Sequence, residues 1–229
     1  MHNSSSLICE TAQQLDPSTP QTKALLIVDM QNSFVHGDDP VVHSMPVDGG
    51  KELVVGINAL QRKFDLVLAT KDWHPEDHGS FASQHPEKNV FDITQLGGVE
   101  QILWPDHCIQ NSQGAEFVAG LNIDKIAHTS FKGLDTNVDS YSGFKDNNQT
   151  AKTDLDEVLK SYGVNEIYIV GLAADYCVKA TAIDGVRLNY QTYLVTDLTK
   201  AVDPSDDNIK TLYAGLTAAG VMLITSNEL

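Results

Sequence analysis

A cysteine in a glycine- and alanine-rich stretch is the first residue whose type and setting could do chemistry. Cys177 lies in IVGLAADYCVKATAIDG, where an apolar strand pattern gives way to a helical one. A thiol in the first turn of a helix is expected to have a lowered pKa, because backbone amide dipoles stabilise the thiolate. Gly171, Ala173 and Ala174 leave room for a substrate close to the backbone, whose amides could form an oxyanion hole. The segment therefore predicts a nucleophile; the alternative is a small buried residue of a core helix.

Two charged residues are candidate partners for this thiol, because each follows an apolar, β-type run. Asp29 ends LLIVD, and a carboxylate at the end of a buried strand is destabilising unless it is paired. It is a candidate general base for the thiol proton, or alternatively a turn or helix-capping residue. Lys132 could pair with both Asp29 and Cys177, where a cation would favour the thiolate and hold the carboxylate in place. The alternative for Lys132 is an ordinary solvated lysine.

A histidine-rich region contains a third group of reactive residues. Asp72 and His74 in DWHPEDHGSF are two positions apart, so they project from the same side of an extended segment. His107 in WPDHC is a candidate third ligand, with His78 and His85 as further candidates. Two imidazoles and one carboxylate suit Zn²⁺, Fe²⁺ or Mn²⁺ and leave coordination positions open. The alternative is a solvated polar loop.

The elements that must position these residues alternate between apolar β-type runs and helical patterns. Strands are predicted at 24–29, 65–70, 125–130, 166–171, 191–197 and 220–225. Helices are predicted at 50–64, 114–121, 153–163, from about 172 to 187, and at 206–218, with a long loop region at 71–111. Such alternation predicts an α/β fold, a parallel sheet with helices on both faces. Because ligands bind beyond the carboxyl ends of parallel strands, four of these strands would deliver reactive side chains to one edge.

Composition limits the class of partner and the compartment. The 229 residues carry 15 Lys and Arg against 31 Asp and Glu, a formal net charge of −16. This charge repels phosphate backbones and anionic lipid surfaces, so we expect no nucleic-acid partner and no membrane partner. No run approaches the roughly 18 apolar residues of a membrane span. Three cysteines and the lack of a basic, apolar leader predict a cytoplasmic location.

Five segments together resemble the nicotinamidases of the isochorismatase-like cysteine hydrolase family. They are ALLIVDMQNSF, ATKDWHPEDHGSFASQH, ILWPDHCIQNSQGAEF, FKGLDTNVDSYSGFKDN and IVGLAADYCVKATAIDG, and they run in order from about residue 24 to residue 190. The resemblance implies a three-layer sandwich around a six-stranded parallel sheet of order 3-2-1-4-5-6. It implies an isochorismatase-like hydrolase domain over residues 21–229, preceded by a flexible extension at 1–20.

The same resemblance assigns roles to residues. Cys177 would be the nucleophile, Asp29 the base and Lys132 the third member of a catalytic triad. One divalent ion, zinc in the first place and iron or manganese otherwise, would be held by three ligands: Asp72, His74 and His107. Family members differ at the position of His78, so its ligation stays open.

The resemblance also implies a substrate pocket. Phe34, Trp104 and Tyr141 would line it around a pyridine ring. The amides of Ala173 and Cys177 would form the oxyanion hole, commonly with a cis peptide before Ala173.

The implied reaction is hydrolysis of nicotinamide to nicotinate and ammonia through a cysteine thioester, in NAD salvage, with pyrazinamide as a further substrate. Three alternatives stay open: a metal-independent amidase or isochorismatase of the same family acting on a different small molecule, a catalytically silent protein that binds nicotinamide or metal, and a structural zinc protein that uses Cys108. The sequence leaves the oligomeric state open, a homo-oligomer included. It departs from the family pattern at Ser33, at Ala174 and in the long polar segment 35–50.

Overall fold

The structure, a computed structural model, describes residues 23–35 and 44–229. The predicted flexible extension at 1–20 lies outside the described residues, and so does the part 36–43 of the polar segment 35–50.

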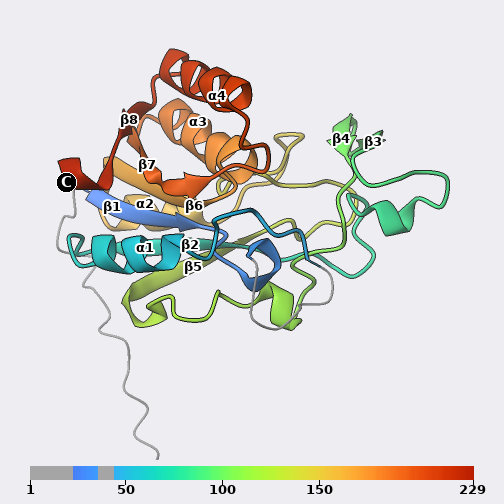
Figure 1. Cartoon of the computed structure of the whole chain (residues 1–229), viewed down its shortest axis with the longest axis horizontal. Helices are drawn as coiled ribbons and strands as arrows, with labels where there is room; N and C mark the ends of the chain where they lie inside the picture. Colours follow the sequence, from blue (N-terminus) through green and yellow to red (C-terminus); the bar gives the residue numbers. More distant parts are fainter. Residues whose placement is uncertain (1–22, 36–43) are drawn as a thin grey trace, which may run out of the picture.

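A six-stranded parallel sheet forms the centre of the molecule (Figure 1). Its strands are β1 (Lys23–Val28), β2 (Val67–Asp72), β5 (Ile126–Lys132), β6 (Glu166–Leu172), β7 (Gln191–Lys200) and β8 (Met222–Ile224). The spatial order is β5-β2-β1-β6-β7-β8, and all five neighbouring pairs are parallel. Counted along the chain within this sheet, that is the predicted order 3-2-1-4-5-6, which is confirmed.

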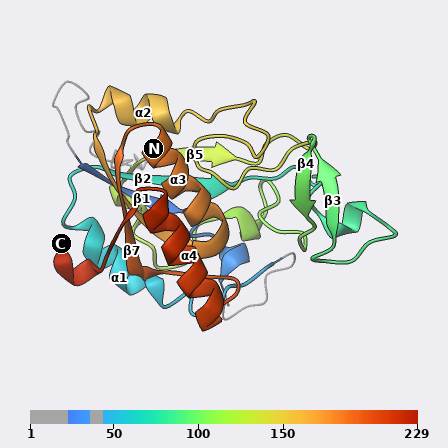
Figure 2. The ribbon, with the colours of Figure 1, turned by 90° about the horizontal axis from the view of Figure 1, so that it is seen from above.

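Helices cover both faces of the sheet (Figures 1 and 2). They are α1 (Leu53–Gln61) on one face and α2 (Leu155–Ser161), α3 (Lys179–Arg187) and α4 (Asp206–Ala218) on the other. The apolar run of β1 explains both layers, because successive side chains of a strand point to opposite faces. Leu25 and Ile27 belong to the core cluster with Ile57 of α1, whereas Leu26 belongs to the cluster with Leu212 of α4. None of the helices in the described part of the chain has the length and apolar character needed to cross a bilayer.

The predicted helix at 114–121 is wrong. Only a 3-10 turn, Gln113–Ala115, forms there, and Gly120 has a positive φ of 89°. The backbone is extended instead, because it hydrogen-bonds to the segment after β1: the Val118 amide donates to the Met30 carbonyl at 2.9 Å. A tertiary contact thus overrides the local helical pattern.

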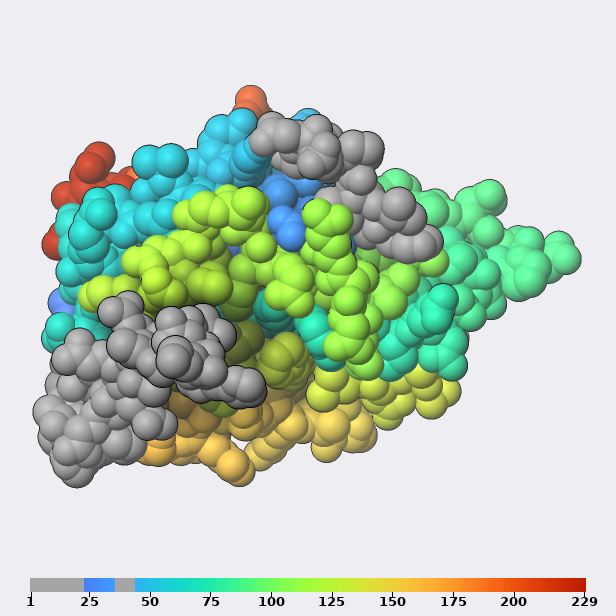
Figure 3. Space-filling view, turned by 90° about the horizontal axis from the view of Figure 1, so that it is seen from below, coloured from blue at the N-terminus to red at the C-terminus, as the bar shows by residue number. Residues whose placement is uncertain are grey.

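The region 71–111, predicted as loop, contains a β-hairpin. Strands β3 (Ile93–Leu96) and β4 (Val99–Ile102) pair antiparallel across Gly97 and Gly98, both of which have positive φ. Two glycines between β-type runs are a strong hairpin signal that was missed. The hairpin lies in the part of the chain that projects from the body of the molecule (Figures 1 and 3), and β4 leads directly into Leu103 and Trp104.

Candidate active site

Three predicted reactive residues meet at the carboxyl edge of the sheet. Asp29 follows β1, Lys132 ends β5, and Cys177 lies in the π-helical turn Ala174–Val178 between β6 and α3. The Lys132 ammonium lies 2.9 Å from Asp29 Oδ2 and 3.5 Å from Cys177 Sγ. All three side chains are buried. The structure therefore brings together the three residues that the sequence singled out for nucleophilic chemistry.

The backbone before Cys177 is shaped by a close approach of β6 to β1. Gly171 has a φ of 109°, and a Cβ there would collide with the Val28 carbonyl, so only glycine fits. The Leu172–Ala173 peptide is cis, as the family resemblance implied. These features place the turn that carries Cys177 directly beyond the end of β6.

Two carboxylates face the Lys132 ammonium. Its ammonium contacts Asp72 Oδ1 at 3.0 Å as well as Asp29, and it donates to the Ser140 carbonyl at 2.9 Å. Burial alone would lower the pKa of Lys132, but the two carboxylates outweigh it and hold that pKa well above the ordinary lysine value. Lys132 is therefore a permanent cation of this site.

Asp29 keeps one oxygen available for a proton. Its Oδ1 accepts a hydrogen bond from the Thr70 hydroxyl at 2.6 Å, whereas Oδ2 has no hydrogen-bond partner among the described residues and only faces Lys132 as an ion pair. Burial raises the pKa of Asp29 above its ordinary value, although the Lys132 charge opposes this. A buried carboxylate with a raised pKa and an oxygen that accepts no hydrogen bond from a described residue is suited to take up a proton.

The expected lowering of the Cys177 pKa is not what the site produces. Burial raises the pKa of this thiol well above its ordinary value; Lys132 opposes the effect, and the carboxylates of Asp29 and Asp72 add to it. Desolvation thus outweighs the helix-terminus effect that the sequence suggested. A thiol whose pKa is raised needs a base to take its proton before it can attack.

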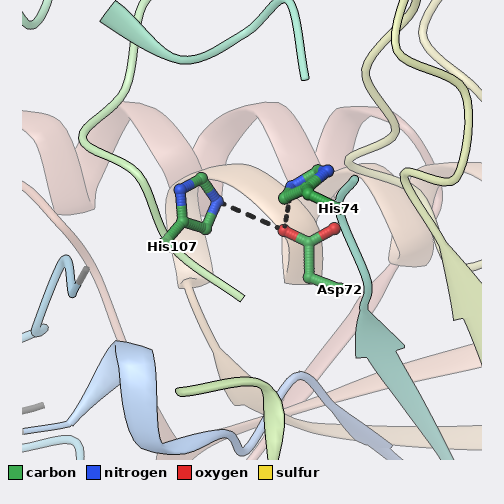
Figure 4. Close-up of side chains that lie close together, drawn as sticks. All are labelled: Asp72, His74 and His107. Carbon is green, nitrogen blue, oxygen red and sulfur yellow. Dashed lines mark hydrogen bonds and ion pairs between the residues drawn. The ribbon is translucent and has the colours of Figure 1, made fainter. Parts of the chain in front are cut away.

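The three predicted metal ligands converge on one oxygen (Figure 4). Asp72 Oδ2 lies 3.0 Å from His74 Nε2 and 3.4 Å from His107 Nε2, and all three side chains are buried. The opposite ring nitrogens contact backbone carbonyls: His74 Nδ1 lies 2.9 Å from Gly133 O and His107 Nδ1 lies 2.7 Å from Pro105 O.

This hydrogen bonding fits a metal ion. If each Nδ1–H donates to its carbonyl, both Nε2 atoms present lone pairs to the same place as the carboxylate, which is the arrangement typical of ligating histidines. The ligand atoms of Asp72, His74 and His107 all lie within 4.8 Å of one another. The close approach of Gly133 to His74 also requires a glycine, because a Cβ at Gly133 would overlap the imidazole.

A second group overlaps the first and contains a residue that sequence reasoning missed. His74, His78 and Asp139 also bring ligand atoms within 4.8 Å of one another, and all three are buried. Nε2 of His78 has no hydrogen-bond partner among the described residues. Asp139 lies in FKGLDTNVDSYSGFKDN, one of the five segments that carry the family resemblance, and that position was the sequence signal that could have identified it. His85 belongs to neither group, since its Nε2 contacts the Gly79 carbonyl at 2.8 Å.

One small pocket joins these two centres. Cys177, Asp72 and His107 line it together with Met45, Asp139, Tyr176, Val202 and the four predicted substrate-binding residues, Phe34, Trp104, Tyr141 and Ala173. Its aromatic side chains contact one another and the ligand group: Trp104 Nε1 donates to the Tyr141 hydroxyl at 3.1 Å, and the ring centroids of Phe34 and His107 lie 5.4 Å apart. A flat aromatic molecule in this pocket would contact both the thiol and the ligand group.

Comparisons with known proteins agree with this geometry. The isochorismatase domain family matches residues 23–228. A nicotinamidase of Escherichia coli K12 is 40% identical over 207 residues, which cover 89% of this chain and 94% of that protein. The solved structure of an Acinetobacter baumanii nicotinamidase and pyrazinamidase is 36% identical, with a TM-score of 0.85, covering 91% of this chain and 98% of that chain. A pyrazinamidase of Pyrococcus horikoshii, solved in complex with zinc, is 33% identical with a TM-score of 0.71, covering 90% of this chain and 99% of that chain.

Proposed function

The chain belongs to the isochorismatase domain family, and on that premise we propose that it is a metal-dependent nicotinamidase, which hydrolyses nicotinamide to nicotinate and ammonia. The similarity to named nicotinamidases over most of the chain supports this substrate. Pyrazinamide has the same relation of carboxamide to ring nitrogen and is expected to react as well. Because nicotinate can be rebuilt into NAD, we place the reaction in cytoplasmic NAD salvage.

The observation that carries the proposal is the single pocket shared by the nucleophile and the ligand group. Cys177 lies on one part of its wall and Asp72 and His107 on another, and aromatic side chains line the space around them. A substrate that fits has a ring nitrogen for one centre and an electrophilic carbon for the other. Nicotinamide carries both on one flat ring.

The donor set fits a divalent ion, because two Nε2 atoms and a carboxylate oxygen converge. The zinc-bound relative favours zinc, and iron or manganese would accept the same ligands. When bound, the ion would hold the ring nitrogen and so orient the carboxamide.

The chain's own residues move the proton. The Asp29 carboxylate would take the Cys177 thiol proton through Oδ2, which faces Lys132 but accepts no hydrogen bond from a described residue, and the sulfur would form a bond to the carboxamide carbon. Asp29 would then pass the proton to the amide nitrogen, so that the C–N bond breaks and ammonia leaves a thioester on Cys177. Lys132 would keep its proton throughout and offset the charge of Asp29.

The carbonyl oxygen gains negative charge in each addition step. The backbone amides of Ala173 and Cys177 would donate hydrogen bonds to it, because both residues line the pocket on the turn after β6. A water molecule, deprotonated by Asp29, would then attack the thioester carbon. The C–S bond would break, nicotinate would leave, and the thiol would regain its proton.

Three alternatives are separated by the same features. A metal-independent amidase or isochorismatase acting on a different small molecule would have no use for the ligand group. A catalytically silent binding protein would not need the buried triad. In a structural zinc protein Cys108 would be a ligand, but Cys108 lies in neither ligand group of the described residues, and burial raises its pKa well above the ordinary value.

The test is ammonia release from nicotinamide by the purified protein, before and after chelation and metal add-back. We expect release that chelation stops and that zinc, iron or manganese restores, while circular dichroism shows the fold intact. Folded, metal-loaded protein with reduced Cys177 that releases no ammonia would contradict the proposal, and isochorismate and other small amides would then be screened.

A further inference from the structure

Two cavities lie on either side of a pair of tyrosines. The pocket that contains Cys177 has a volume of only about 20 Å³, whereas an outer cavity that contains Lys179 and Arg187 has a volume of about 430 Å³. Tyr141 and Tyr176 line both cavities, so their rings form the wall between them. A volume of about 10–15 Å³ holds one water molecule, so an aromatic amide can enter the inner pocket only if part of its wall moves.

The two tyrosines are held very differently. The Tyr141 hydroxyl accepts hydrogen bonds from Trp104 Nε1 and from Gln101 Nε2, both at 3.1 Å. The Tyr176 ring makes edge contacts with two aromatic rings, its centroid lying 4.8 Å from that of Trp104 and 5.6 Å from that of Tyr141, and no described residue hydrogen-bonds its hydroxyl. Both tyrosines are half-buried, whereas Trp104 is buried, so the hydrogen bonds of Tyr141 are what distinguish the two. Tyr176 is therefore the part of this wall that can move most easily.

The backbone of Tyr176 is fixed even though its ring is not. The amides of Tyr176 and Val178 both donate to the Ala173 carbonyl at 3.1 Å, within the turn that carries Cys177. A rotation of the Tyr176 side chain would thus open the wall without displacing the neighbouring thiol. Removal of the ring would join the inner pocket to the outer cavity.

We propose that Tyr176 is a specificity-determining residue, whose ring closes the substrate pocket against the outer cavity and restricts the site to single-ring carboxamides. This inference rests on the proposed nicotinamidase function. The outer cavity is the subsite that a larger ring substituent would occupy once the wall is removed. Its lining is partly charged, with four carboxylates (Glu100, Asp146, Asp175 and Asp184) beside the two cations, so a substituent there would remain partly hydrated.

The test compares kcat/KM for nicotinamide with kcat/KM for nicotinamides that carry a phenyl group at ring position 4, 5 or 6. In Tyr176→Ala the ratio of substituted to unsubstituted substrate is expected to rise at least about tenfold for one of these positions, the range typical of a pocket-size effect. Tyr176→Phe keeps the ring and is expected to keep the wild-type ratio. Adding Ala180→Phe, which fills the outer cavity, to Tyr176→Ala is expected to reverse the gain.

A gain below tenfold at every ring position would overturn the inference while leaving the nicotinamidase function standing. A wild-type protein that does not hydrolyse nicotinamide would overturn the function instead. Calorimetric binding of phenyl-substituted nicotinates, which needs no turnover, then tests the wall alone: affinity that is unchanged in Tyr176→Ala contradicts it. If Tyr176→Ala does not fold, Tyr176→Leu replaces it, because leucine also removes the ring but keeps apolar contact with Trp104.

Discussion

The side-chain amide of Gln31 holds the backbone of Asp72 from both directions. Gln31 Nε2 donates to the Asp72 carbonyl at 2.7 Å, and Gln31 Oε1 accepts from the Asp72 amide at 2.8 Å. Gln31 lies two residues after Asp29, so one short segment beyond β1 supplies the proposed base and positions a proposed metal ligand. The thiol centre and the ligand group are therefore coupled through the backbone as well as through Lys132.

Gln31→Leu is expected to weaken metal binding without touching a ligand. The substitution leaves the buried amide and carbonyl of Asp72 unpaired, which destabilises the fold by about 1–3 kcal/mol for each group. Loss of such an outer hydrogen-bond partner typically lowers metal affinity by about 10- to 100-fold. Metal titration and denaturant unfolding measure the two effects separately.

Asn58→Leu is the matched control for Gln31→Leu. Asn58 also bridges a backbone donor and a backbone acceptor, Asn122 N at 2.8 Å and Gly120 O at 2.7 Å, but it lies on α1 away from the ligand group. The Asn58→Leu variant should lose stability and keep its metal affinity. Equal metal affinity in Gln31→Leu and in wild type would show that Asp72 does not depend on Gln31.

Cys177→Ala is expected to abolish turnover, by at least about 10³-fold, because removal of a nucleophile disables the whole catalytic unit. Metal content should stay at the wild-type level, since Cys177 belongs to neither ligand group. Cys108→Ala removes the other buried thiol of the described chain and should retain turnover. If Cys177→Ala kept more than about a hundredth of wild-type kcat/KM, Cys177 would not be the nucleophile.

Asp29→Asn is expected to separate thiol reactivity from catalysis. The Asp29 carboxylate is one of the causes that raise the pKa of Cys177, while Lys132 lowers it, so removing the negative charge should lower that pKa. Each unit of pKa yields about tenfold more thiolate at a pH well below the pKa. Iodoacetamide should therefore label Cys177 faster at pH 7 in Asp29→Asn than in wild type. The pH profile of the labelling rate should also shift to lower pH in the variant.

Turnover of Asp29→Asn should fall by about 10²- to 10⁴-fold, because no other group replaces the proton acceptor. Labelling followed by mass spectrometry, with nicotinamide turnover in the same samples, compares both quantities. Slower labelling together with lost turnover would indicate that Asp29 activates the resting thiol directly, contrary to the raised pKa of that thiol.

The sequence predicted those parts of the fold that follow from local pattern and from motifs. The buried β-type runs and the residues at their carboxyl ends were found because apolar runs mark buried strands and ligands bind beyond the carboxyl ends of parallel strands, whereas the strand order came from the family resemblance. The segment 114–121 was misassigned because its structure depends on a hydrogen bond to Met30, which no local pattern reveals. The hairpin at Gly97 and Gly98 was missed although its turn residues were visible.

The candidate site shows the same division. Cys177, Lys132 and Asp72 could be named from their types and positions, but the direction of the shift in the Cys177 pKa depends on burial, which only the packed structure supplies. Asp139 and Tyr176 were missed because their importance comes from what they face across the pocket. Contacts between distant segments therefore set the chemistry of residues that the sequence can only nominate.

His107→Ala is expected to lower metal content and to raise KM more than it lowers kcat. His107 supplies one of the two imidazole nitrogens beside Asp72, while Asp29, Lys132 and Cys177 stay in place, so anchoring of the ring should suffer more than the attack on the amide. We expect metal affinity to fall by at least about 100-fold, more than the loss from removing an outer hydrogen-bond partner. His128→Ala removes a histidine that only pairs with Asp154 near the surface and should change neither quantity. Mass spectrometry measures the metal stoichiometry, and steady-state kinetics measure KM and kcat. Unchanged metal stoichiometry in His107→Ala would exclude His107 as a ligand. An equal loss of metal in His128→Ala would mean that general destabilisation, not ligation, is being measured.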